Sequence, residues 1–501
     1  MIPQAKTNST LRGAEWYIFL ALLLCYIFTL PRWADWNVNS RFDLVLAIVD
    51  HGTLTIDAYL PNTGDYAEFN GHAYSDKAPG TSFLGILPYW VFKTFGGRAL
   101  VEALAPRVSN SALLSTLDPN GRGLVAENLY VFAALTFATF FVVALPAALL
   151  GVLLYRMLCV WANQPRDALI LTLAYGLATP AFAYSNNLYS HQPVAFLLFA
   201  AFYLVFQTTH GVHPRLFAAL AGFALGWALI TEYPTALIAG GIGLYALYKW
   251  RNVQQLALLC AAAIPPLVLM AAYNYAIFGT PLPVGYLYSP LYMNLHHVGL
   301  ISLTYPHPVF LWQLTFGVQR GLFPLAPFLL LAIPGFIWFG QERKWRAEFF
   351  LSLWSVISFF LFNASSVMWQ GGFAVGPRYI VPMLPFLTLP IIFVLNRAHA
   401  RWTRVGIYAL ILISAVLEWI SALSGQEFPQ FQAFPMVEYS LPHLLAGDIA
   451  RNFGMFLNFK GLTSLIPLGI LMLFLTILYR SILRPRTRTP VAPPEPRAVL
   501  H

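Results

Sequence analysis

Charge is the scarcest property of this sequence. Only 10% of its 501 residues are Asp, Glu, Lys or Arg, while 58% are hydrophobic and 16% aromatic. A soluble globular protein of this length needs a charged surface, and a mean hydropathy of +0.64 leaves too few residues to make one. The composition therefore excludes soluble classes, nucleic-acid binders among them, and predicts an all-α polytopic membrane protein.

Cysteine is almost as rare. The three cysteines, Cys25, Cys159 and Cys260, lie in or at the edge of apolar runs. Such positions build neither an extracellular disulfide framework nor a zinc-ligand spacing, so we expect no redox chemistry. The first apolar run lacks a small-residue cleavage site after it and is predicted to remain as a transmembrane helix.

Apolar runs of membrane-crossing length recur along the rest of the chain. They predict about twelve transmembrane helices. These lie near residues 15–32, 128–155, 168–185, 191–209, 215–231, 234–249, 255–274, 321–339, 349–366, 378–396, 405–423 and 462–479. The stretch 81–96 is shorter and contains Pro88 and Lys93, so we expect it to lie in the membrane interface rather than to cross.

Basic residues indicate the orientation. If 81–96 does not cross, both termini fall on the same side as the short connections that carry Arg156, Lys249, Arg343 and Arg397. The positive-inside rule places that side in the cytoplasm of a cell whose inner (plasma) membrane holds the protein.

The predicted organisation follows from this orientation. It comprises a cytoplasmic N-terminus (1–14), a transmembrane domain (15–480) and a disordered, basic, Pro-rich cytoplasmic tail (481–501). The long loops 33–127, 275–320 and 424–461 are then extracytoplasmic, and function is expected there.

The first outer loop concentrates charge. Residues 39–52, NSRFDLVLAIVDHG, predict an interfacial helix with Asp43 and Asp50 facing outward. Residues 53–80 follow with four carboxylates, His72 and Lys77 on a segment rich in Gly and Pro. Such a turn-rich charged loop, pinned between two membrane-contacting segments, is typical of a site built on a scaffold, although a solvated loop with ordinary charges is the alternative.

This loop resembles that of a known superfamily. The run from Asn39-Ser40-Arg41 to Ala73-Tyr74-Ser75-Asp76-Lys77-Ala78-Pro79-Gly80 is similar to the first extracytoplasmic loop of GT-C glycosyltransferases, particularly the protein O-mannosyltransferase and aminoarabinose-transferase branch with its bacterial family 39-like members. Asp76 and Lys77 match the acid-Lys pair of that branch, and residues 81–96 match its juxtamembrane segment. Where the family has its catalytic aspartate, three residues before the Arg, this sequence has Val38. The catalytic base is then sought among Asp43, Asp65 and Asp76, with Asp65 as first choice.

A second element points the same way. Residues 365–386, SSVMWQGGFAVGPRYIVPMLPF, resemble the W-x-G-G-x-x-x-G-P-R-Y element of bacterial GT-C-like proteins. Arg378 falls at the start of a helix at the outer membrane edge, where an unpaired cation needs an anion. That anion is either an outer-loop carboxylate or a lipid phosphate gripped by two hydrogen bonds.

The resemblance implies a function and a set of site residues. The function is an integral membrane glycosyltransferase that moves a sugar, with inversion, from a polyprenyl-phosphate donor to a hydroxyl of a glycan, lipid or protein on the extracytoplasmic face. Lys77, Arg378 and Arg41 are candidate phosphate ligands. Candidate substrate contacts are Tyr74, Trp369, Tyr379, His191 and Glu232, the last two being equally suited to helix caps.

Three questions stay open at this stage. A divalent metal is possible, but none of the outer-face candidates His51, His72, His191, His296, His297, His307 and Asp76 has a ligand spacing that argues for it. A transporter or flippase of lipid-linked sugars would need ionisable residues near the bilayer midplane. A noncatalytic envelope-assembly protein would use the charged loop for docking.

Overall fold

The computed structural model describes residues 9–32, 35–114 and 125–483, and within them helix dominates. The α-helices are α1 (Ser9–Phe28), α2 (Trp36–Leu46), α3 (Gly80–Thr94), α4 (Gly97–Ser109), α5 (Val125–Thr139), α6 (Leu145–Trp161), α7 (Pro165–Leu177), α8 (His191–Thr208), α9 (Pro214–Thr231), α10 (Ala236–Lys249), α11 (Val253–Phe278), α12 (Met293–His296), α13 (Pro308–Thr315), α14 (Leu322–Leu325), α15 (Ala332–Gln341), α16 (Arg346–Ala364), α17 (Leu384–Thr388), α18 (Ile391–Arg397), α19 (Arg401–Leu423), α20 (Leu441–Leu445), α21 (Phe453–Phe456) and α22 (Ile466–Leu483). One antiparallel hairpin, β1 (Ala67–Phe69) with β2 (His72–Tyr74), lies in the first loop.

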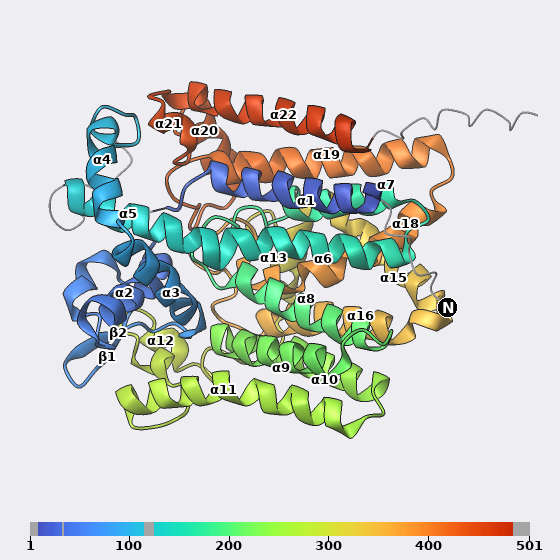
Figure 1. Ribbon diagram of the computed structural model, residues 1–501, viewed down its shortest axis with the longest axis horizontal. Helices are drawn as coiled ribbons and strands as arrows, with labels where there is room; N and C mark the ends of the chain where they lie inside the picture. Colours follow the sequence, from blue (N-terminus) through green and yellow to red (C-terminus); the bar gives the residue numbers. More distant parts are fainter. Residues whose placement is uncertain (1–8, 33–34, 115–124, 484–501) are drawn as a thin grey trace, which may run out of the picture.

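The long helices run side by side along the longest axis of the molecule (Figure 1). Helix α1 begins and α22 ends at one end of this bundle, while α2, α3, the hairpin and α12 gather at the opposite end. The charged first loop therefore lies on the face opposite to the two described chain ends. This is the arrangement that the positions of the basic residues predict.

Eight helical segments in the described part of the chain are long and apolar enough to cross a membrane. They are Leu129–Trp161, His191–Thr208, Pro214–Thr231, Val253–Phe278, Arg343–Ala364, Arg378–Arg397, Arg401–Leu423 and Gly461–Ile482. The other four predicted spans fall on α1, α7, α10 and the shorter apolar segment Pro327–Gln341. The prediction of an all-α polytopic membrane protein is confirmed. Helix α3, which covers most of the doubtful stretch 81–96, has 15 residues and is not among the eight.

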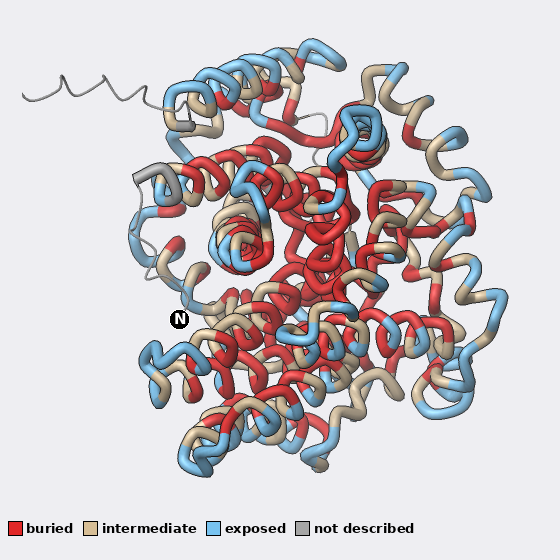
Figure 2. Tube along the Cα trace, turned by 90° about the vertical axis from the view of Figure 1, so that its right-hand side faces the viewer, coloured by how far each residue is buried: buried red, intermediate tan, exposed pale blue. Residues whose placement is uncertain are grey.

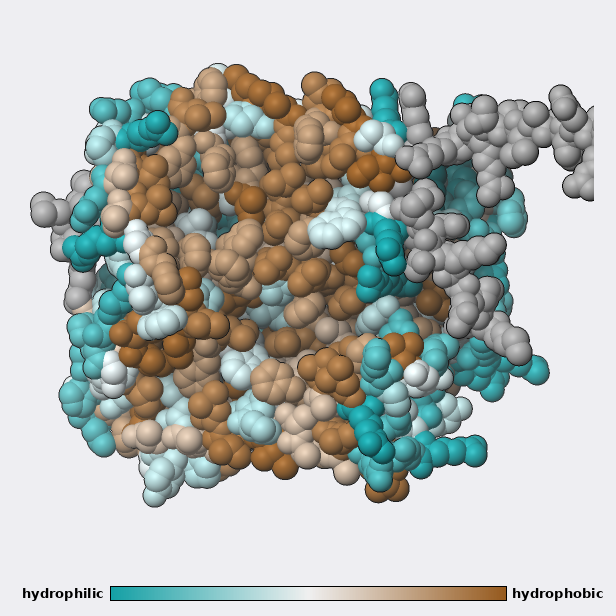
Figure 3. All heavy atoms as spheres, in the orientation of Figure 1, coloured by the Kyte–Doolittle hydropathy of each residue, from teal (hydrophilic) through white to brown (hydrophobic). Residues whose placement is uncertain are grey.

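The surface has the polarity of a membrane protein. Hydrophobic residues cover the middle of the face seen in Figure 3, and hydrophilic residues gather at its two ends. Buried segments fill the interior of the bundle, with exposed residues around its periphery (Figure 2). An apolar belt between two polar ends matches a hydrocarbon layer between two aqueous faces.

Proline shortens or breaks some predicted spans. Helix α7 ends at Leu177, where a helix to residue 185 was expected, and an irregular segment that contains Pro180 leads to α8. The span 378–396 is a 3₁₀ turn, η9 (Arg378–Met383), followed by α17 and α18, with prolines at 382, 385 and 390. Proline cannot donate the backbone hydrogen bond that a continuous helix needs. Apolar periodicity alone does not show these interruptions.

A single guanidinium joins three loops. Arg320 is 1% exposed. Its Nη1 donates to the carbonyl of Ala374 at 2.5 Å, and its Nη2 donates to those of Gly372 at 2.7 Å and Pro429 at 3.1 Å and also to that of Gln430. The loops 275–320, 367–377 and 424–461 are thereby held to one another.

Two predictions concern parts outside the described residues. Residues 1–8 and the tail from Arg484 are not described, so the expected disorder of the tail stays a prediction. Helix α22 continues to Leu483, so the first three residues of the predicted tail are helical.

Candidate active site

Helix α2 is the first element that positions the site. Asp35 caps it by accepting hydrogen bonds from the amides of Asn37 at 3.0 Å and Val38 at 3.3 Å. Residues Val38 to Ala47 are buried, so the helix packs inside the outer end of the protein. The expectation that Asp43 faces outward was therefore wrong. Its carboxylate is 2% exposed and accepts from Asn62 at 3.1 Å.

The loop after the hairpin is the second element. Asn70 and Gly71 both have positive φ, of 52° and 79°, which gives the two-residue turn between β1 and β2. Further on, a Cβ at Gly80 would lie 2.3 Å from Thr231 Oγ1 and 2.8 Å from the backbone of Ile230. Only glycine permits this approach, which holds the Asp76-Lys77 segment against the outer end of α9.

Lys77 lies between two aspartates. Its Nζ is 3.0 Å from Asp65 Oδ2 and 3.1 Å from Asp76, and the three side chains are at most 8% exposed. Burial lowers the pKa of Lys77, but the two carboxylates outweigh this effect and hold the pKa above its usual value, so the ammonium stays charged. Asp65 and Asp76 are eleven residues apart in sequence. The structure brings them together as the sequence analysis expected for a site.

The carboxylates of this cluster differ. Asp76 has no exposed side-chain surface, and burial raises its pKa while Lys77 and, more weakly, Arg41 act against that rise. Asp65 contacts Lys77 through Oδ2, whereas its buried Oδ1 has no hydrogen-bond partner in the described part of the chain. A carboxylate oxygen without a hydrogen-bond partner is available to accept a proton. Burying such an oxygen costs free energy, so we expect a ligand to contact it in the functional state.

Arg41 extends the cluster toward the ends of α8 and α9. Its Nη1 donates to the carbonyl of Asn37 at 3.1 Å and its Nη2 to Ser190 Oγ at 3.1 Å. Ser190 donates in turn to Glu232 Oε1 at 2.6 Å, and that oxygen is 2.5 Å from His191 Nδ1. Burial raises the pKa of Glu232, but His191, Ser190 and Arg41 outweigh it and lower the pKa. A buried serine, missed by the sequence analysis, therefore connects two of the predicted residues.

Arg378 reaches the site from the other side of His191. Its guanidinium lies over the rings of Tyr189 and Tyr379, 5.2 and 5.1 Å from their centroids. It donates to the Tyr189 hydroxyl at 3.2 Å and the Tyr379 hydroxyl at 3.4 Å. The Tyr189 ring stacks on His191 with centroids 5.6 Å apart. Arg378 is 8% exposed, yet no carboxylate of the described ranges forms an ion pair with it.

The second outer loop covers this group with aromatic residues. The Tyr292 ring centroid is 5.9 Å from Lys77 Nζ. Burial and, after it, Asp65 raise the pKa of Tyr292 to about 12, while Lys77 and Arg378 act against the rise. Tyr292 therefore covers Lys77 and lies within electrostatic range of Arg378. Its position in a loop without a motif gave no signal in the sequence.

His296, in the same loop, gives a pH-dependent prediction. Burial lowers its pKa from 6.5 to about 4, and Lys77 adds to this effect. Between these two values the unfolded chain binds a proton that the folded chain does not, so the free energy of unfolding should fall as the pH drops from about 6.5 to about 4. Thermal unfolding of the detergent-solubilised protein across this range should show a smaller loss for His296→Gln. The same loss of thermal stability in wild type and His296→Gln would contradict the prediction. His399 is exposed, so His399→Gln supplies the control variant.

Two predicted substrate contacts lie outside the charged group. Tyr74 packs against Phe278 with ring centroids 6.2 Å apart, in the small apolar cluster beside the hairpin. Trp369 is 8% exposed and stacks on Phe310 at 5.6 Å. In the structure both side chains pack against other aromatic rings. Their contact with a substrate stays a prediction.

The described histidines are scattered over the structure. Within residues 9–32, 35–114 and 125–483, no three His, Cys, Asp or Glu side chains are grouped to hold a metal ion. Asp57, for instance, binds the His72 ring at 2.7 Å and the amide of Ala73 at 2.6 Å. Burial raises the pKa of Asp57, but these two contacts outweigh it and lower the pKa, as expected of a carboxylate that fixes the hairpin.

Comparison with known proteins gives structural neighbours alone. No protein-family model and no curated protein matches the sequence. ArnT from Cupriavidus metallidurans in the apo state has 16% identity over 93% of this chain and 71% of its own, with a TM-score of 0.49. The undecaprenyl phosphate-bound form of ArnT has 15% identity over 94% and 72%, with a TM-score of 0.45. The archaeal oligosaccharyltransferase AglB from Archaeoglobus fulgidus, in complex with an inhibitory peptide and a dolichol-phosphate, has 12% identity over 83% and 55%, with a TM-score of 0.44. Likenesses of this size do not identify a function, so the proposal below rests on this chain's own residues.

Proposed function

We propose that the protein is an integral membrane glycosyltransferase that uses a polyprenyl-phosphate-linked sugar at the extracytoplasmic face of the inner membrane. The observation that carries this proposal is Arg378, which is buried without a carboxylate partner in the described ranges and binds Tyr189, next to the Ser190 that binds Arg41. A buried cation is costly unless an anion joins it. A phosphate on a lipid is the anion that reaches the rim of a membrane bundle.

The remaining residues supply a single displacement at the anomeric carbon. The acceptor hydroxyl oxygen forms a bond to that carbon, and the bond from the carbon to the phosphate oxygen breaks. Asp65 takes the hydroxyl proton through its unpartnered Oδ1, while the electron pair of the broken bond stays on the departing polyprenyl phosphate. Attack opposite to the leaving group inverts the anomeric centre.

The cations act on the leaving group. Lys77 and Arg378 stabilise the negative charge that gathers on the phosphate as the bond breaks, and Arg41 adds a third positive charge nearby. Asp76 keeps Lys77 charged and in place. Glu232 and His191, joined through Ser190 to Arg41, are left to hydrogen-bond the sugar.

Binding of undecaprenyl phosphate tests the phosphate site directly. Arg378→Gln should weaken binding to the purified protein by roughly 10- to 10²-fold, because hydrogen bonds to a charged group contribute about 1.5–3 kcal/mol. Native mass spectrometry in detergent measures the bound fraction. Arg378→Lys should recover only part of the affinity, since an ammonium cannot make the paired contact.

A matched control is available at the other end of the bundle. Arg397 forms an ion pair with Glu342 at 3.5 Å and lies over the Trp338 ring. Arg397→Gln should leave binding unchanged. Equal affinities for wild type and Arg378→Gln would refute the phosphate site, and specific binding without any sugar transfer would favour a transporter or an assembly protein.

A further inference from the structure

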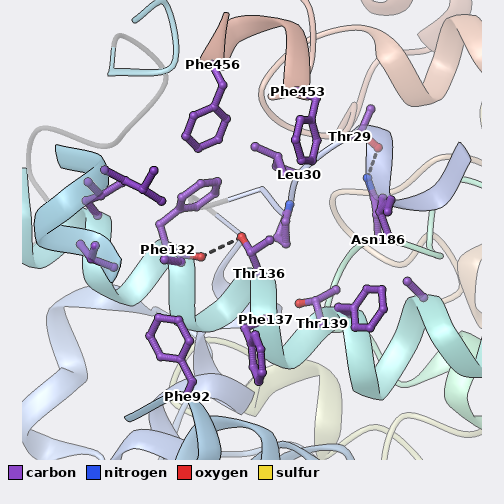
Figure 4. A pocket seen from close by; sticks show the side chains of 18 of the residues that line it. Thr29, Leu30, Phe92, Phe132, Thr136, Phe137, Thr139, Asn186, Phe453 and Phe456 are labelled. Atoms are coloured by element: carbon purple, nitrogen blue, oxygen red, sulfur yellow. Dashed lines mark hydrogen bonds between the residues drawn. The ribbon is translucent and has the colours of Figure 1, made fainter. Parts of the chain in front are cut away.

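An apolar cavity of about 350 Å³ lies beside the candidate active site. It is bounded by the end of α1 and by α3, α4, α5 and α21. Figure 4 shows Phe453 and Phe456 on one side of this space, Phe92 on the opposite side and Phe132 and Phe137 between them. This volume is in the range of ligand-binding pockets.

The wall of this cavity suits an alkyl chain. Two of its polar side chains are already engaged, since Thr136 donates to the carbonyl of Phe132 at 2.8 Å and Asn186 donates to Thr29. Leu100 and Phe453, each 53% exposed, form apolar edges of the cavity at the protein surface. Apolar edges of this kind in a membrane protein allow a hydrocarbon chain to enter, and they have no side-chain groups that hydrogen-bond water.

A second pocket of about 520 Å³ adjoins the cavity and has the opposite character. Its lining includes Ser109, Asn110, Gln426, Asp448 and Asn458. Gln426 donates to Asp448 at 3.0 Å, while its buried Oε1 has no partner in the described part of the chain. Amide, hydroxyl and carboxylate groups in this number match a ligand rich in hydroxyls.

The two pockets meet along the same two elements. At the end of α4, Val108 lines the apolar cavity and its neighbour Ser109 lines the polar pocket. In α21, Phe456 lines the apolar cavity and its neighbour Met455 lines the polar pocket. An apolar chamber and a polar one that share the ends of α4 and α21 fit an amphiphile with a long chain and a polar head.

The cavity also shares a segment with the phosphate site. Asn186 lies in its wall, and Tyr189, three residues later, contacts Arg378. The amide of Tyr189 donates to the carbonyl of Asn187 at 2.7 Å, so the connecting residues form a tight turn. A molecule in the cavity is therefore separated from the donor phosphate by one short turn.

We propose that these paired pockets bind a glycolipid, with its alkyl chain between α4 and α5 and its saccharide head in the polar pocket. Resting on the glycosyltransferase function proposed above, this assigns a lipid-borne acceptor to the enzyme. The segment with Asn186 in the cavity wall and Tyr189 at Arg378 then lies between the acceptor chain and the donor phosphate.

Photocrosslinking tests this assignment without requiring turnover. The full-length protein is placed in phosphatidylcholine nanodiscs that contain a trace of galactosyl diacylglycerol with a diazirine in one acyl chain. A phosphatidylcholine with the same diazirine chain serves as the matched probe. We expect peptides from α4 and α5 to be labelled several-fold more by the glycolipid than by the matched probe.

Filling the cavity supplies the control. Ala133→Trp from α5 and, independently, Leu104→Trp from α4 should abolish the excess labelling, whereas Ala261→Trp on the exposed surface of α11 should not. Thermal unfolding of each variant shows whether it is folded. Equal labelling by the two probes, or labelling unchanged in both folded filling variants, would overturn the glycolipid site.

The outcome is separable from that of the phosphate site. If labelling is not selective but Arg378→Gln still loses undecaprenyl phosphate, only the acceptor assignment fails. If labelling is selective but Arg378→Gln binds undecaprenyl phosphate normally, the glycolipid pocket stands and the transferase proposal fails.

Discussion

Replacing Asp65 with asparagine is expected to slow sugar transfer by on the order of 10²- to 10⁴-fold, the usual contribution of a general base. Asparagine keeps the shape of the side chain and still offers an oxygen to Lys77, but it cannot take up the proton of the acceptor hydroxyl. Affinity for undecaprenyl phosphate should change little, because Arg378 and Lys77 are untouched. Single-turnover transfer from a radiolabelled polyprenyl-phosphate sugar measures the rate of the chemical step.

Two comparisons sharpen this test. Asp57→Asn changes a carboxylate of the same loop that binds His72 and Ala73 rather than Lys77, and it should retain transfer if the hairpin folds. Asp76→Asn replaces one of the two oxygens of Asp76 that contact Lys77 with an amide group and should weaken donor binding as well as the rate. A full rate in Asp65→Asn together with a lost rate in Asp76→Asn would move the base to Asp76.

Replacing Lys77 is expected to reduce transfer by about 10²- to 10³-fold, the loss seen when a preorganised donor to a developing negative charge is removed. The loss should appear mainly in kcat, because the contact strengthens as charge gathers on the phosphate. Lys77→Ala would leave two buried carboxylates together, at a cost of about 3–5 kcal/mol of stability. Lys77→Gln retains hydrogen bonds to both aspartates and is the better variant.

Lys93 provides the matched control for Lys77. It lies on α3, in the same outer region, and its Nζ is 2.7 Å from Asp50 with 43% of its side chain exposed. Lys93→Gln should leave transfer within about twofold of wild type, because an exposed ion pair contributes about 0–1 kcal/mol. A Lys77→Gln variant that is folded and transfers sugar at the wild-type rate would exclude Lys77 from the mechanism.

The sequence predicted the charged group better than its surroundings. Asp65, Asp76, Lys77 and Arg41 come from the first loop and Arg378 from a distant element, and their contacts lie at one end of the bundle. Charged residues make up only 10% of this chain, so a short motif that contains them is informative. A buried charge is costly and is retained where it has a partner or a function. Asp43 was misplaced because the helical spacing that separates two faces does not show which face is buried.

Other parts were not predictable from local patterns. Ser190 and Tyr189 stand in the polar stretch SNNLYSHQP, which predicts only the start of a helix, and their role depends on the contacts of that stretch with α2, Glu232 and η9. Asp35 caps α2 and also accepts from Tyr189, a pairing across more than 150 residues. Long-range partners of this kind are set by packing, which periodicity does not encode.

The Arg320 clamp limits how the protein can open. Four charge-assisted hydrogen bonds, each contributing about 1.5–3 kcal/mol, tie three loop segments to one side chain. Separating these segments would leave a buried guanidinium without its carbonyl partners, so we expect the three loops to move together. Under the proposed function, a substrate would then enter between the helices, beneath these loops, rather than through a gap between them.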